Sequence, residues 1–307
     1  MDFFAFLYPI EWVVAWIMYG SHWLFTTLGM ASGPGTAWVL SIVALVIVIR
    51  ILLIPLFFKQ IKASRGMQMI QPELQAVQKK YKGKTDPASR ENMTRETMEL
   101  YRKHGTNPFA SCMPILLQTP FFMGLYRVLS HVASGNAVGA LSKTDAVSAQ
   151  HAHFFGAPLS LSFLHHTPAQ MAAVGITSVT NLQIVAVIMA VIYATSQFLT
   201  QRMMMAKNTN LDSSVPNPMM QSQKIMLYVM PFGMLFFSLN VQIGVVLYLM
   251  TTNVWTIGQQ FYTLRNSPMP GSQAEKEMIA RRKAKEERKR QELIAKDPEA
   301  AKEPETV

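Results

Sequence analysis

One arginine lies inside a long apolar run, where its chemistry is that of a cation removed from bulk water. Arg50 falls within residues 36–58, which read TAWVLSIVALVIVIRILLIPLFF, and Lys59 follows directly. A guanidinium inside hydrocarbon costs roughly 2.5–3.5 kcal/mol on insertion scales, so it should face protein or water and not lipid. Two interpretations stay open. Arg50 either extends along its own stem to the membrane surface, or it lines a polar, water-filled cavity.

The run around Arg50 is long enough to cross a membrane. As one continuous helix, residues 36–58 would cover the roughly 30 Å of a bilayer's hydrocarbon core. Half of the 307 residues are hydrophobic and only 15% are charged, which is typical of a membrane protein with soluble appendages. We therefore predict an all-α integral membrane protein with five transmembrane helices, at about 36–58, 108–129, 182–200, 225–239 and 243–262.

The basic residues fall on alternate connections between these segments. The first 49 residues contain no Lys or Arg, whereas eleven lie between Lys59 and Gly105 and eleven more between Arg265 and the end. Because cytoplasmic segments are enriched in Lys and Arg, this pattern predicts that the N-terminus is outside and the C-terminus is cytoplasmic.

Three segments flank or interrupt the spans. Residues 1–35 are predicted to form an amphipathic helix on the outer face, with tryptophans at the interface; the alternative is a sixth span. Residues 60–107 are predicted to form a cytoplasmic helical hairpin, because Asp86 followed by Pro87 is typical of a helix start. Residues 263–307 are a charged cytoplasmic tail in which residues 275–296 could be helical.

Several polar residues of the spans fall in the middle or in the cytoplasmic half. If their faces pack together, they enclose a hydrophilic cavity that opens to the cytoplasm and is sealed toward the exterior. The alternative is that they form ordinary hydrogen-bonded pairs between helices. The unpaired charge in the first span favours the cavity, and the predicted site consists of Arg50, Gln118, Gln197, Gln201, Thr252, Asn253 and Gln259.

The sequence offers little for catalysis or metal binding. A single cysteine, Cys112, rules out an internal disulfide framework. The histidines of the loop after the second span, among them His165 and His166, have no carboxylate or cysteine partners nearby in the sequence. A Gly-rich nucleotide-binding loop is also missing. We therefore expect no enzymatic activity, no cofactor and no metal.

Four stretches carry a resemblance to a known family. PLFFKQIKASRGMQMIQPELQAVQKKY, MELYRKHGTNPFASCMPILLQTPFFMGLYRVL, NPMMQSQKIMLYVMPFGMLFF and VVLYLMTTNVWTIGQQ resemble, in order and spacing, the YidC membrane insertases of bacteria and their Oxa and Albino organelle relatives. The resemblance covers about residues 36–262. It implies five spans, a cytoplasmic hairpin, and a positively charged groove open to the cytoplasm and to lipid. It also implies that Arg50 contacts incoming substrates and that Gln201 lies in the groove.

These observations predict a membrane protein insertase and chaperone of the bacterial plasma membrane. Its predicted partners are nascent membrane proteins as substrates, membrane lipids, the Sec translocon, and the ribosome through the basic tail. Two alternatives remain: an anion channel or carrier that uses Arg50, and a passive scaffold that holds ribosomes or membrane proteins.

Overall fold

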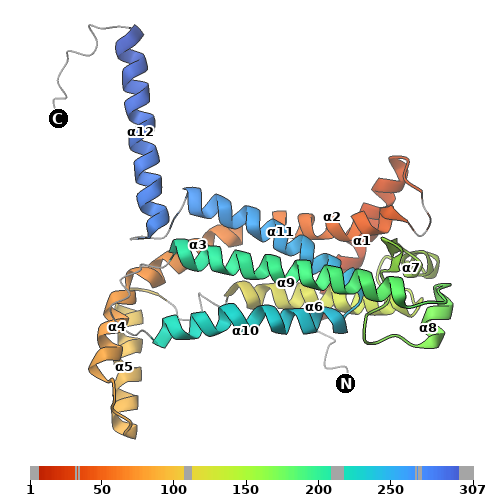
Figure 1. The fold of residues 1–307 in the computed structure, drawn as a ribbon, viewed down its shortest axis with the longest axis horizontal. Helices are drawn as coiled ribbons and strands as arrows, with labels where there is room; N and C mark the ends of the chain where they lie inside the picture. Colours follow the sequence, from red (N-terminus) through yellow and green to blue (C-terminus); the bar gives the residue numbers. More distant parts are fainter. Residues whose placement is uncertain are drawn as a thin grey trace.

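Five helices run side by side along the long axis of the molecule (Figure 1). The computed structural model describes residues 7–31, 33, 35–106, 113–208, 218–266, 268 and 272–296. Successive helices of the bundle point in opposite directions, and α10 and α11 are joined by residues 241–242 alone. The five are α2 (Thr36–Leu52), α6 (Met113–Ala133), α9 (Thr180–Asn208), α10 (Pro218–Asn240) and α11 (Ile243–Asn266). The prediction of a helical protein is therefore confirmed.

The predicted continuous helix over residues 36–58 is wrong, because the chain bends by 56° between α2 and the following helix α3 (Ile54–Met69). Leu53 lies at the break. Pro55 explains it, since proline has no N–H to donate and its ring clashes with the carbonyl four residues earlier. Arg50 consequently lies in the last turn of α2, directly before the bend.

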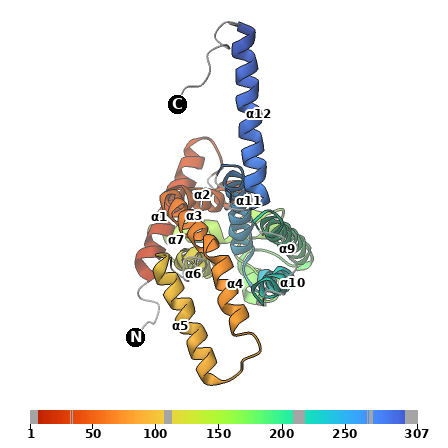
Figure 2. The ribbon, with the colours of Figure 1, turned by 90° about the vertical axis from the view of Figure 1, so that its left-hand side faces the viewer.

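The connections separate to opposite ends of the bundle. At one end, α4 (Gln71–Lys80) and α5 (Pro87–Lys103) form the predicted hairpin, and α12 (Gln273–Lys296) projects the opposite way (Figures 1 and 2). The Asp86 carboxylate accepts a hydrogen bond from the Ser89 backbone N–H at 2.8 Å, which confirms the predicted helix start. At the other end lie α7 (Lys143–Gln150), the short strands β1 (His153–Phe154) and β2 (Ala157–Pro158), and α8 (Pro168–Ala173).

The N-terminal helix α1 (Tyr8–Thr27) packs against α2 and α6 through a buried face. Its opposite face exposes aromatic side chains, namely Tyr8, Trp12, Trp16 and Trp23. Two glycines permit α1 to approach α6 and the loop after it closely. A Cβ on Gly124 of α6 would lie 2.9 Å from Ile10, and a Cβ on Gly139 would lie 2.7 Å from Ala15. α1 is thus docked on the bundle along one face, with the tryptophans on the other.

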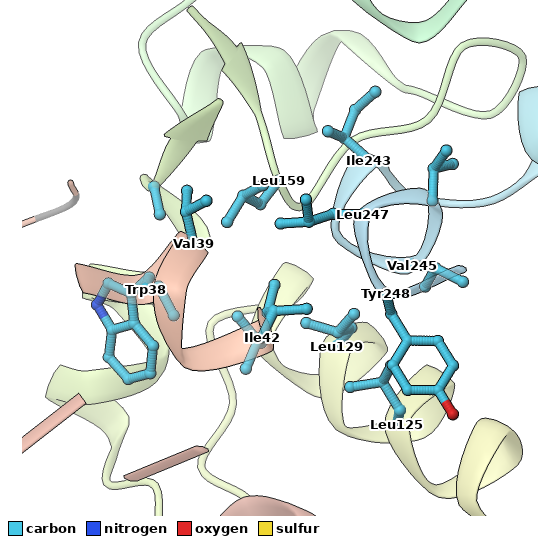
Figure 3. Close-up of a cluster of buried hydrophobic side chains, with 14 of the residues drawn as sticks. Trp38, Val39, Ile42, Leu125, Leu129, Leu159, Ile243, Val245, Leu247 and Tyr248 are labelled. Carbon is cyan, nitrogen blue, oxygen red and sulfur yellow. The ribbon is translucent and has the colours of Figure 1, made fainter. Parts of the chain in front are cut away.

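A cluster of buried apolar side chains lies where α2, α6 and α11 meet beside the strands. Figure 3 shows Ile42, Leu129, Leu159 and Leu247 converging there from four segments of the chain. Because the first amides of a helix have no partner within it, the loop supplies acceptors: Leu161 and Leu159 carbonyls accept from the amides of Ile243 and Gly244, both at 2.9 Å. The loop after α6 therefore closes this end of the bundle.

By length and apolar composition, one described helix could cross a membrane by itself, α9 over Thr180–Met205. The bent pair Thr36–Leu52 and Ile54–Ala63 would make a second, and Leu227–Asn240 is a shorter apolar helix. The number of five spans and their orientation therefore stay predictions.

Candidate functional site

A groove of about 560 Å³ lies between α3 and α11, next to the break that ends α2. Its rim is open, because Phe58 of α3 and Val254 and Tyr262 of α11 are 48%, 70% and 50% exposed. We call it the groove and define it by its lining residues, which are Arg50, Leu53, Ile54, Phe57, Phe58, Gln60, Gln118, Val254, Trp255, Gly258, Gln259 and Tyr262.

Arg50 contributes the groove's positive charge. Its side chain is half-buried, and it interacts electrostatically with Tyr248 of α11. The bend at Leu53 puts non-helical backbone beside it, and such backbone is tolerated at membrane depth where it is buried in protein or lines a water-filled cavity. Charge and broken backbone thus lie together in the lining of one groove.

Gln118 joins the groove to the core. Its side-chain amide donates a hydrogen bond to the Tyr248 hydroxyl, across the contact between α6 and α11. Tyr248 is itself buried, and its hydroxyl points away from the apolar side chains of the cluster (Figure 3). The ring therefore belongs to the core, while the hydroxyl is bonded to Gln118, which lines the groove.

The seven predicted site residues do not all meet. Arg50, Gln118 and Gln259 line the groove together. Asn253 is buried and donates to the Ser196 hydroxyl at 2.6 Å, which is a hydrogen-bonded pair between α11 and α9. The half-buried Thr252, Gln197 and Gln201 are not among the described residues that line the groove.

The groove is more apolar and aromatic than the sequence suggested. The rings of Phe58 and Tyr262 meet edge to face, 6.4 Å apart, across the gap between α3 and α11. Phe57, Trp255 and Gln60 also line it and were not predicted. A signal existed, because Leu53, Phe57 and Gln60 are spaced by four and three residues and so share a helical face.

A second charge lies inside the bundle, although the sequence indicated Arg50 alone. Arg127 lies within α6, which continues to Ala133, and it forms an ion pair with Glu11 of α1. The Glu11 side chain is 5% exposed and that of Arg127 25%. Arg127 also lies over the ring of Tyr8, 5.9 Å from its centroid. A buried charge is tolerated when it is paired, so these two stabilise each other outside the groove.

The histidines near and after the end of α6 contact backbone; His131 itself lies in the last turn of α6. Nδ1 of His131 lies 2.8 Å from the Arg127 carbonyl, and Nδ1 of His166 lies 3.1 Å from that of Ser162. In the part of the chain that the structure describes, no cluster of three His, Cys, Asp or Glu residues could hold a metal ion.

Known proteins resemble this chain in sequence. The family model described as "60Kd inner membrane protein" matches residues 30–270. Among similar curated proteins, the membrane protein insertase YidC of Streptomyces avermitilis is 43% identical over 282 residues, covering 92% of this chain and 64% of that protein. That of Tropheryma whipplei (strain Twist) is 38% identical over 277 residues, covering 87% and 86%.

A solved structure titled "Active YidC insertase crystal structure with the first transmembrane domain resolved" is 21% identical, with a TM-score of 0.48, and covers 86% of this chain and 47% of that one. The relationship to known proteins therefore rests on the sequence.

Proposed function

The chain belongs to the 60Kd inner membrane protein family, and we propose that it inserts membrane proteins into the bacterial plasma membrane and helps them fold. The relatives that match most of its length are named membrane protein insertases. This chain spans 64% of the Streptomyces relative's length, so the activity is proposed from its own groove as well as from their names.

The observation that carries the proposal is a cation beside a broken helix in an open groove. A substrate must move a polar flanking segment through roughly 30 Å of hydrocarbon. A hydrated groove shortens that path, and Arg50 attracts acidic residues of the segment. The exposed apolar residues at the rim, Phe58 and Val254, offer the substrate's own apolar span a route to lipid.

The proposed topology has five spans, with the N-terminus outside and the C-terminus in the cytoplasm. The hairpin and α12, which hold most of the basic residues, project from the same end of the bundle. The loop with few charges lies at the other end, and α1 lies there with its tryptophans exposed. Cytoplasmic segments are the basic ones, which supports this orientation.

The rival function, an anion channel or carrier, needs a polar path between both ends of the bundle. Beyond the groove, the described core is filled by apolar side chains such as Ile42, Leu129 and Leu247 (Figure 3). Such apolar packing would block a polar path between the two ends, so it favours an insertase with a groove open on one side over a channel or carrier. A scaffold that holds other proteins remains compatible with insertion by the same molecule.

The proposed partners are nascent membrane proteins, membrane lipids, the Sec translocon and the ribosome. The exposed basic residues of α12 support the ribosome contact, because a polyanion releases counterions when it binds them. Removal of residues 272–307 should therefore weaken ribosome binding most at low salt, as measured by co-sedimentation with membranes. Equal binding at low salt without the tail would show that the tail makes no contribution to ribosome binding.

The test of the main proposal uses the purified protein in liposomes and substrates whose translocated tails are acidic or neutral. Arg50→Ala should slow insertion of the acidic-tailed substrate about tenfold or more, since a hydrogen bond to a charged group contributes roughly 1.5–3 kcal/mol. Arg50→Lys should retain most of the rate. Arg202→Ala, which removes an exposed arginine outside the groove, is the matched control. Equal insertion of both substrates by Arg50→Ala would refute the role of the charge.

A further inference from the structure

Three glutamine amides line the groove besides Arg50. Gln60 comes from α3, Gln118 from α6 and Gln259 from α11, so each stands on a different helix. All three side chains are half-buried, in a lining that is otherwise largely apolar and aromatic. An amide in such a place costs free energy unless it is hydrogen-bonded. Gln118 already donates to the Tyr248 hydroxyl, so the groove offers the remaining donors and acceptors of the three amides to water or to a ligand with hydrogen-bonding groups.

The chemistry of a glutamine amide matches that of the peptide backbone. It offers N–H donors and a carbonyl acceptor together, whereas arginine only donates. A helical substrate satisfies its own backbone groups, but an extended one carries an N–H and a C=O on nearly every residue that must find partners outside water. We propose that the groove binds the main chain of an extended substrate segment, and that Gln60, Gln118 and Gln259 make these contacts.

The length of the groove limits the segment that it can hold. The residues of α11 that line it run from Val254 to Tyr262, which is eight positions or about 12 Å at the helical rise. At about 3.3 Å per residue, that length corresponds to roughly four residues of extended chain. The rim of the groove is open, so the substrate chain can continue beyond it.

Because the amides meet the backbone and not side chains, the contacts are independent of the substrate's sequence, while Arg50 adds a preference for acidic residues. This inference rests on the proposed insertase function and specifies the form in which the translocated segment occupies the groove.

The test compares two synthetic substrates in liposomes containing the full-length protein. Both carry one apolar span and a neutral tail of Gly, Ser and Ala. In the second, alternate tail residues are N-methylated, which removes backbone N–H donors. The measured quantity is the acceleration, the insertion rate with protein divided by the rate in protein-free liposomes. This ratio cancels the easier spontaneous crossing of the methylated tail.

Wild type should accelerate the unmodified substrate about tenfold more than the methylated one. Gln60→Leu and Gln259→Leu should each lower the acceleration of the unmodified substrate by about threefold to tenfold, the usual worth of one net hydrogen bond, with little effect on the methylated one. Gln60→Asn should keep more of the acceleration than Gln60→Leu. Gln260→Leu, which changes a neighbour that is not among the lining residues, is the control.

Two results would overturn the inference. One is equal acceleration of both substrates by wild type. The other is an equal loss for both substrates in Gln60→Leu and Gln259→Leu, which would mean that the amides only hold water in the groove. Failure of the wild type to accelerate either substrate would instead overturn the proposed function itself. Circular dichroism and thermal unfolding in detergent confirm that each variant is folded.

Discussion

The ion pair between Glu11 and Arg127 should hold α1 on the bundle. Glu11→Gln keeps the shape of the side chain but leaves Arg127 without its counter-charge, and Arg127→Gln does the reverse. Breaking a buried pair by changing one partner costs about 3–5 kcal/mol. Because Arg127 is a quarter exposed, we expect the lower end, about 3 kcal/mol in the free energy of unfolding.

For a chain of this size, each kcal/mol lowers Tm by about 2–4 °C, so either single variant should unfold about 6–12 °C below wild type. The double variant, in which both residues are Gln, leaves no unpaired charge. It should be more stable than the sum of the two losses predicts, with a coupling of about 1–3 kcal/mol.

The assay is thermal unfolding in detergent, followed by tryptophan fluorescence and circular dichroism. Three of the five tryptophans lie on α1, so fluorescence reports mainly on that helix. The exposed Arg202→Ala serves again as the control and should leave Tm unchanged. Single variants that unfold with the wild type, together with a double variant that shows no coupling, would refute the view that this pair holds α1.

Three further outcomes are expected. Gly139→Ala should detach α1 from the bundle and change its tryptophan fluorescence, because the added Cβ would lie 2.7 Å from Ala15 at a φ of +55°. Gly83→Ala is the control: its φ of +83° causes backbone strain, but the added Cβ has no neighbour within 4 Å. That variant should leave the fluorescence of α1 unchanged. Pro55→Ala should straighten the bend between α2 and α3 by restoring an N–H. The measurement is the distance between spin labels at the N-terminal end of α2 and the C-terminal end of α3, which should become longer. An unchanged distance would assign the bend to packing. The backbone N–H of Ser89 holds the pKa of the Asp86 carboxyl below its ordinary value. This cap should therefore stabilise α5 at pH 5 and above, and its contribution should be lost as the pH falls through the lowered pKa. The measurement is hydrogen exchange of the Ser89 amide, corrected for the intrinsic rate; protection that does not change with pH would contradict the prediction.

Local chemistry made several features predictable from the sequence. The helical class follows from long apolar segments, and the hairpin's helix start at Asp86 follows from a cap that involves residues three positions apart. The importance of Arg50 also follows from the sequence, since a charge in an apolar run must face something polar whatever the fold. Even the bend had a local signal in Pro55, although the length of the run favoured one continuous helix.

Only the tertiary structure decided which polar side chains meet. Helical periodicity places residues on a face of their own helix, and position along the span gives depth, but neither fixes how far each helix is rotated about its axis relative to its neighbours. That rotation is set by packing, for example by the close contact of Gly244 with Leu129 and Ile42. It turns Gln118 toward Tyr248 and pairs Asn253 with Ser196.

The same rotation leaves Arg50 in a groove with aromatic walls and closes Arg127 into an ion pair with a residue more than a hundred positions away. The sequence therefore determined that a charge and several amides lie within apolar helices. The packing of those helices determined which of these groups face the groove and which face one another.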